Sequence, residues 1–393
     1  MSQPKTSKRL DEDCLKRLKK TIKHMSMSRK SIINDPSYCT DLPVEIGLKL
    51  TNGCNLRCKH CFEWNDEGFH RDMDLQEQRA QLDIDIIKKI LKQTQSVKSN
   101  LYLWGGEPLI YNKWNELVDL LTADPRWTVL CTNGLLIENK IESLLQISEN
   151  LACLISLEGF EEENDRIRGK GTFQNVMRNI DLLLDLQRKG IYKGRVSVHM
   201  TISEYMIDKL YDFVDFFENK DIDTLYLTLP WYLPEEVSKE MDQYYEKNFK
   251  WLANNVDEHH RYSWHSFKFK LEAKFVEPLI QQMEKINQKN WSIRVRYQPG
   301  LETNQVKDYI VGSSEPVQNK EKCLALNSRM DVLADGKVTA CKHFSELAIA
   351  DLNIVDDIKA VWQGEEFNEV RKTINCGLMP VCSKCILLYL NGN

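Results

Sequence analysis

The chain has 393 residues, of which 42% are hydrophobic and 28% are charged, and its formal net charge is −5. This composition is typical of a soluble globular protein with two or three domains, and it excludes a disordered chain. No apolar run reaches the roughly 18 residues that a membrane span needs, and the polar N-terminus is not a secretory signal. The net negative charge gives no reason to expect nucleic-acid binding.

Residues 1–43 are expected to be a basic N-terminal extension. Ten Lys or Arg stand against four Asp or Glu over residues 1–35. The segment 11–24 predicts a short helix, because acidic residues begin it and basic residues end it, as the helix dipole prefers. A solvated terminal helix is the simpler interpretation, and a docking arm for an acidic partner is the alternative.

A regular alternation of strands and helices follows over residues 44–230. Six short β-rich apolar runs are separated by five segments with helical spacing, which predicts βαβ units and a parallel sheet, open or curved toward a barrel. Such sheets bind ligands at the carboxyl ends of their strands, so the chemistry is expected there. The predicted strands lie at 44–50, 100–104, 127–131, 152–157, 195–202 and 224–229, and the helices at 80–96, 112–123, 137–148, 173–189 and 205–219.

Residues 231–320 break this alternation with several prolines and a high aromatic content. An inserted helical subdomain with its own core is the simpler interpretation, and a substrate-facing cap whose aromatic rings line a pocket is the alternative. The segment contains His259, His260 and His265, which could suggest a metal site. They follow acidic residues in a polar stretch, so a solvated face is expected instead.

Residues 321–393 are expected to form a small C-terminal domain. The stretch 329–341 alternates apolar and polar residues around Asp335 and Gly336, which predicts a β-hairpin because this pair tolerates the positive φ of a tight turn. A helix is predicted over residues 356–373.

The twelve cysteines are the main chemical clue. Without an export signal, a reducing cytoplasm is expected, so the thiols are predicted to be metal ligands, catalytic groups or core residues rather than disulfides. Cys54, Cys58 and Cys61 directly follow the first predicted strand, and Phe62 comes next. Four thiolates would close a metal centre, whereas three would leave one iron of a 4Fe–4S cluster open.

This C-x3-C-x2-C spacing resembles the signature of the radical S-adenosylmethionine (SAM) superfamily. The resemblance implies an α/β fold over about residues 44–230, a partial six-stranded (β/α)6 barrel, with a 4Fe–4S cluster on the three cysteines. Further motifs at later strand ends also resemble the family: GGEP at 105–108, TNG at 132–134 and the stretch 156–173. The residues that the resemblance assigns to SAM binding are His60, Phe62, Gly105, Gly106, Glu107, Pro108, Thr132, Asn133, Ser156, Glu158 and Arg168.

Within that set, His60 and Phe62 resemble the positions that flank adenine. The backbone of the GGEP motif is expected to approach the amino group of the methionine moiety, with Glu107 as a charged support. Arg168 is expected to clamp the methionine carboxylate.

The C-terminal cysteines resemble the SPASM/twitch extension found on many radical SAM enzymes. The pattern runs Cys323-x12-Gly336-x4-Cys341 and then Cys382-x2-Cys385. It implies one auxiliary 4Fe–4S cluster, and a four-cysteine zinc site is the alternative. Cys376 is left over as a buried thiol, a substitute ligand or a hydrogen-atom donor.

The resemblance implies reductive cleavage of SAM to methionine and a 5′-deoxyadenosyl radical, which takes a hydrogen atom from a substrate. Modification of a peptide or protein by crosslinking, epimerisation or oxidation is expected. Only about 43 residues precede the barrel, which are too few for the leader-recognition domain of many peptide maturases.

Two alternatives stay open. One is a dehydrogenase or epimerase of a sugar, cyclitol or other natural-product intermediate, and the other is a non-catalytic iron–sulfur or zinc protein. A flavodoxin or ferredoxin is the expected electron donor, and neither a nucleic acid nor a membrane is an expected partner. The catalytic residue is unassigned, with Glu158 and Cys376 as candidates.

Overall fold

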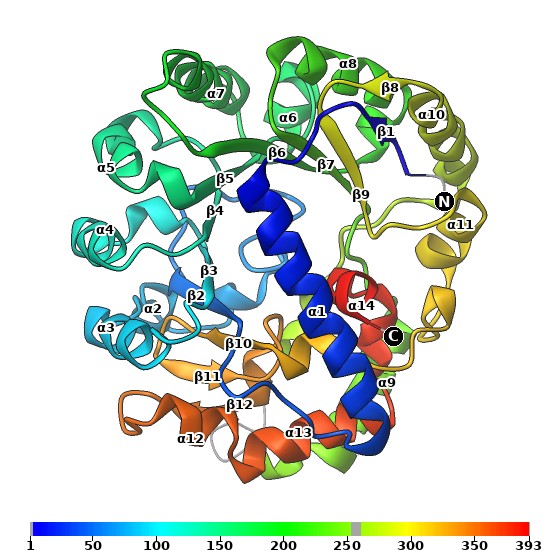
Figure 1. Cartoon of the computed structure of the whole chain (residues 1–393). Helices are drawn as coiled ribbons and strands as arrows, with labels where there is room; N and C mark the ends of the chain where they lie inside the picture. Colours follow the sequence, from blue (N-terminus) through cyan, green and yellow to red (C-terminus); the bar gives the residue numbers. More distant parts are fainter. Residues whose placement is uncertain (1–2, 253–260, 393) are drawn as a thin grey trace.

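The structure is a computed structural model of the chain, and it describes residues 3–252 and 261–392. Within these residues, ten strands form one sheet in the order β12-β11-β10-β2-β3-β4-β5-β6-β7-β9. The run from β10 to β9 is parallel, and β11 and β12 add to it antiparallel. The sheet curves into an open barrel with helices outside it (Figure 1). The strands are β2 (Glu45–Thr51), β3 (Asn100–Gly105), β4 (Thr128–Thr132), β5 (Leu151–Ser156), β6 (Arg195–Thr201), β7 (Thr224–Thr228), β9 (Arg294–Gln298), β10 (Arg329–Val332), β11 (Lys337–Thr339) and β12 (Ala348–Asp351).

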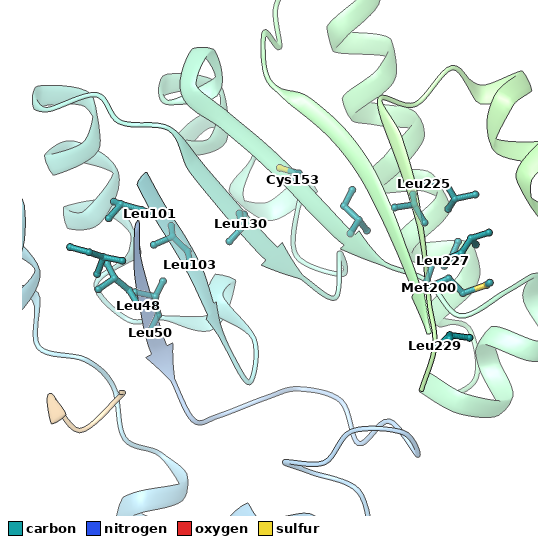
Figure 2. Close-up of a cluster of buried hydrophobic side chains, with 14 of the residues drawn as sticks. Leu48, Leu50, Leu101, Leu103, Leu130, Cys153, Met200, Leu225, Leu227 and Leu229 are labelled. Carbon is teal, nitrogen blue, oxygen red and sulfur yellow. The ribbon is translucent and has the colours of Figure 1, made fainter. Parts of the chain in front are cut away.

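The helices between strands bury one apolar face against the sheet. In α3, the Asp83 side chain caps the first turn, and Ile86, Ile87 and Ile90 point inward at helical spacing. Figure 2 shows the leucines of β2, β3, β4 and β7 that form the other side of this core. The helices are α2 (Leu75–Gln78), α3 (Ile84–Gln93), α4 (Trp114–Ala123), α5 (Ile141–Gln146), α6 (Glu161–Arg168), α7 (Thr172–Arg188), α8 (Leu210–Lys220), α9 (Glu235–Asn248), α10 (Val276–Gln288), α11 (Thr303–Val311), α12 (Ile358–Trp362), α13 (Glu365–Cys376) and α14 (Ile386–Asn391). Among the described residues, no helix has the length and apolar character that crossing a membrane requires.

The N-terminal helix α1 (Glu12–Asn34) crosses the barrel where the strands begin (Figure 1). Arg195 at the start of β6 pairs with Asp11, and the Arg17 guanidinium lies 3.9 Å from the ring centroid of Trp127, just before β4. Most of the helix is exposed, and only Ser28 and Ile32 are buried. The predicted terminal helix is confirmed and extends ten residues beyond the expected end, while an acidic partner stays a prediction.

Two strands extend the six-stranded core beyond the sequence prediction. Strand β9 pairs with β7 from within the aromatic-rich segment, and β10 pairs with β2 from the C-terminal segment. Polar side chains on β9, such as Arg294 and Arg296, hide its strand character in the sequence. The predicted hairpin is confirmed, because β10 pairs antiparallel with β11 and Gly336 has a φ of +87°. Strand β1 (Lys5–Thr6) pairs with β8 (Asn290–Trp291) in a separate ladder.

Candidate active site

The first cysteine group lies on the loop after β2, at the carboxyl edge of the parallel sheet. The Cys61 amide donates to the Cys58 carbonyl over 3.0 Å, which turns the loop between these two cysteines. Burial raises the pKa of Cys54 to about 12, and the Cys58 thiolate charge acts on it in the same direction. Burial also raises the pKa of Cys58, which the nearby Arg168 guanidinium partly offsets. Three thiols near a cation suit a cluster that three thiolates hold.

The GGEP motif holds this cysteine loop in place. The Gly106 and Glu107 amides donate to the Thr51 and Gly53 carbonyls, each over 2.9 Å. A Cβ on Gly106 would lie 2.1 Å from the Gly53 oxygen, so the two backbones touch only because no side chain intervenes. Both amides are occupied, and an approach to the SAM amino group would therefore use the carbonyls of the motif, since an ammonium needs acceptors.

Glu107 joins the ends of β3 and β4. Its side chain is fully buried and accepts hydrogen bonds from the Thr132 hydroxyl and the Asn133 amide, both over 2.7 Å, and from the Leu109 amide over 3.0 Å. Burial raises the pKa of this carboxyl, and the three donors oppose that shift. The Asn133 side chain in turn donates to Asn55 of the cysteine loop over 2.7 Å. The motif residues thus act on the cysteine loop through hydrogen bonds.

Glu158, just beyond β5, accepts hydrogen bonds from three donors. It accepts from His60 over 2.8 Å, from the Arg168 guanidinium over 2.7 Å and from the Thr201 amide over 2.7 Å. Burial alone would raise the pKa of Glu158, but the charges of His60 and Arg168 outweigh it and hold the pKa well below its usual value. Arg168 is therefore paired within the protein, and its role as a clamp for a ligand carboxylate stays a prediction.

Other predicted residues lie around this network. Pro108 begins a short 3-10 helix and is buried beside Glu107. Ser156 is half-buried at the end of β5, beside His199 of β6. The buried Nδ1 atom of His60 has no hydrogen-bond partner within the described residues. An unpartnered ring nitrogen beside three thiols suits a site that receives a polar ligand.

The second cysteine group comes together from distant segments. Cys323 precedes β10, Cys341 follows β11, and Cys382 and Cys385 flank one turn, yet the four line one cavity between the barrel and the C-terminal helices. A zinc ion with bonds of about 2.3 Å would hold its sulfurs about 3.8 Å apart. In the described part of the chain, no three or more His, Cys, Asp or Glu side chains are placed to hold a single metal ion. The four thiols nonetheless line one cavity and match the ligand count of either a 4Fe–4S cluster or a zinc site.

The remaining candidates are more dispersed. Cys376 ends α13 with an exposed side chain, so the suggestion of a buried thiol is wrong. It does not line the cavity of the four cysteines. His265 pairs with Asp242 over 2.8 Å, whereas His259 and His260 lie outside the described residues.

The aromatic-rich segment reaches the cysteine loop. The Phe62 ring stacks on Phe267 with centroids 4.3 Å apart, and Trp231 meets His343 with centroids 3.9 Å apart. Deeper residues such as Trp264 and Phe249 are fully buried. The buried residues of the segment thus belong to the same core as the barrel, and its rings also reach the cysteine loop, while a substrate-facing cap stays a prediction.

Family models match both cysteine regions. The model described as the radical SAM superfamily matches residues 48–217, which contain the first cysteine group and the GGEP motif. Residues 48–217 therefore form a radical SAM domain. A second model, described as an iron–sulfur cluster-binding domain and named SPASM, matches residues 323–386. The cofactors of this radical SAM protein are SAM, a 4Fe–4S cluster and auxiliary iron–sulfur.

Two curated relatives match part of this radical SAM protein. It is 31% identical over 174 residues, 44% of this chain, to the mycofactocin maturase MftC of Mycolicibacterium smegmatis. It is 28% identical over 176 residues, again 44% of this chain, to the Fe-coproporphyrin III synthase of Methanosarcina barkeri. The matches cover 41% and 39% of those proteins, less than half their length.

A solved structure shares the fold. Streptococcus suis SuiB, bound to the precursor peptide SuiA, superposes with a TM-score of 0.59 at 16% sequence identity. The superposition covers 95% of this chain and 77% of SuiB. The similarity therefore includes the barrel and the C-terminal cysteine region together.

Sequence reasoning missed several residues of this region. Thr201 and Asn55 act through a backbone amide and a short side chain, which no motif marks. Lys342 and His343 follow Cys341 directly and face the barrel. The sequence does contain a pattern that marks them, because the residue types of Cys58-Lys59-His60 recur in Cys341-Lys342-His343.

Proposed function

We propose that the chain is a radical SAM enzyme that takes a hydrogen atom from a peptide or protein substrate. The observation that carries the proposal is the loop of Cys54, Cys58 and Cys61, fixed by the GGEP backbone at the carboxyl edge of the parallel sheet. When bound there, the cluster and SAM together supply the 5′-deoxyadenosyl radical.

The residues of the chain then bind and orient the cofactors. Cys54, Cys58 and Cys61 would hold the first cluster, and Cys323, Cys341, Cys382 and Cys385 would hold one auxiliary cluster. Glu158 keeps His60 and Arg168 in position through buried hydrogen bonds, and the carbonyls of Gly105 and Gly106 would meet the SAM amino group. Phe62, packed on Phe267, excludes water beside the cysteine loop.

A peptide or protein substrate is supported by two relatives. One is named a maturase, and the solved SuiB structure contains a precursor peptide. The rings of the aromatic-rich segment beside the cysteine loop give a surface on which a peptide side chain would pack. A cytoplasmic location fits this proposal, since all twelve cysteines are free thiols.

The test is anaerobic reconstitution with iron and sulfide, followed by dithionite and SAM. We expect 5′-deoxyadenosine from the intact chain and none when Cys54, Cys58 and Cys61 are changed together to Ala. Cys14→Ala, on the N-terminal helix, is the control and should retain the product. A reconstituted chain that holds iron but never cleaves SAM would refute the enzymatic proposal in favour of a non-catalytic metal protein.

The auxiliary site has its own test. Changing Cys382 and Cys385 to Ala should lower the iron content from about eight to about four per chain, since each cubane holds four irons. Iron near four with one zinc in the fully reconstituted intact chain would instead establish the zinc alternative. Mass spectrometry of candidate peptides and of small polar substrates, incubated with the active enzyme, then separates the two substrate classes.

A further inference from the structure

A small cavity lies between the two cysteine groups. Phe62 and Glu63, next to Cys61, line one side of it, and Lys342 and His343, next to Cys341, line the other. Lys49 and Trp104, near the ends of β2 and β3, form its floor. Its volume is about 60 Å³, which is room for roughly four waters or one carboxylate group.

The two lysines and two carboxylates that line this cavity differ in their ion-pair partners. Lys49 pairs with Glu63 over 2.8 Å, and Asp335 at the rim pairs with Lys337 over 3.2 Å. Lys342 has no carboxylate partner among the described residues. Its ammonium lies over aromatic rings instead, 4.0 Å from the Tyr102 centroid and 4.8 Å from the Trp104 centroid. The Lys342 charge is therefore balanced only at longer range, by carboxylates such as Asp331 and Glu45, and no carboxylate in the described part of the chain contacts it directly.

Two residues that line the cavity each have a ring nitrogen without a partner. The Trp104 Nε1 and His343 Nε2 atoms are buried and have no hydrogen-bond partner in the described residues. An indole N–H can only donate, and leaving such a group unsatisfied costs about 1–3 kcal/mol. An anion that accepts from Trp104 and Lys342 would satisfy both groups.

We propose that this cavity binds a carboxylate of the substrate, held by Lys342, Trp104 and His343 between the two cysteine groups. The inference rests on the proposed function, whose substrate it restricts to carboxylate-bearing molecules. The apolar rings of Phe62 and Trp104 favour a carboxylate attached to an apolar group. A peptide C-terminus and an Asp or Glu side chain share this chemistry.

The test is fluorine NMR on the reconstituted protein with saturating SAM and no reductant. The probes are 3,3,3-trifluoropropanoate and its uncharged amide, whose line broadening reports binding without turnover. We expect the acid to bind at least tenfold more tightly than the amide, and Lys342→Gln to weaken the acid at least tenfold. Lys342→Arg should retain binding, and Trp104→Phe, which removes only the N–H and keeps an aromatic ring, should weaken it. N-acetylphenylalanine and N-acetylaspartate α-amide, which carry no fluorine, then compete with the fluorinated acid, and the stronger competitor shows which kind of carboxylate binds more tightly.

The matched control is Lys285→Gln. Lys285 also lies 4.0 Å from a tyrosine centroid, that of Tyr211, but on the far surface of α10. Equal binding of acid and amide, or unchanged acid binding in Lys342→Gln, would overturn the proposal. The iron content of each variant is measured in parallel. If Lys342 only balances the charge at Cys341, Lys342→Gln will lower the iron content and leave probe binding intact, and that result also overturns the proposal. If the reconstituted intact chain binds the acid but does not cleave SAM, the enzymatic proposal is refuted and the carboxylate site stands.

Discussion

Replacing Gly106 by Ala tests how the barrel fixes the first cysteine loop. The added Cβ would lie 2.1 Å from the Gly53 oxygen and 2.5 Å from the Asn52 oxygen, both backbone atoms that no rotamer change can move. Ordinary contact requires the two backbones to separate by roughly 1 Å or more. That movement breaks the hydrogen bonds from the Gly106 and Glu107 amides, whose loss costs about 0.5–1.5 kcal/mol each.

The displaced loop carries Cys54, so Gly106→Ala is expected to lower both the unfolding free energy, by about 1–3 kcal/mol, and the iron bound after reconstitution. Denaturant unfolding and iron analysis measure the two effects. Gly53→Ala is the matched control in the same loop, because its Cβ would lie 3.3 Å from the flexible end of Ile110. Full iron and unchanged stability in Gly106→Ala would show that the close approach does not hold the cysteine loop.

Two further perturbations probe the buried charges. Glu158→Gln leaves the buried Arg168 without its anion, so the unfolding free energy should fall by about 3–5 kcal/mol. The control is Glu162→Gln, which removes an exposed ion pair with Arg166 and should change the unfolding free energy by less than about 1 kcal/mol. Equal effects of the two changes would contradict this account. Burial lowers the pKa of His70 to about 3. Below about pH 6.5 the unfolded chain therefore binds a proton at this histidine that the folded chain does not bind. The unfolding free energy should decline as the pH falls below that value, by about 2 kcal/mol at pH 5. His70→Asn should make this slope shallower in denaturant titrations, and an unchanged slope would count against the burial argument.

The parallel core could be predicted because its signals are local. Each of the six predicted strands appears within one residue of its expected start and end, since buried strands are continuous apolar runs. The pairing of β10 with β2 joins residues more than 280 positions apart, and no local pattern encodes such a partner. Strand β9 was missed for a different reason, because polar side chains on one of its faces interrupt the apolar run.

The candidate site divides along similar lines. Cysteine spacing and the GGEP motif are visible in the sequence, because backbone geometry fixes those residue types. Hydrogen-bond partners are not, since the same Arg168 could face a ligand or Glu158, and the fold selects Glu158. The position of Lys342 depends on how the C-terminal segment packs on the barrel, which spacing alone does not determine.

The pairing of β10 with β2 has a mechanical consequence. Strand β2 leads into the Cys54 loop, and Cys341 follows β11, two strands away, so one sheet ties a cysteine of each group to the barrel. Clusters bound at the two groups would then be held to one continuous sheet rather than to two separately folded domains.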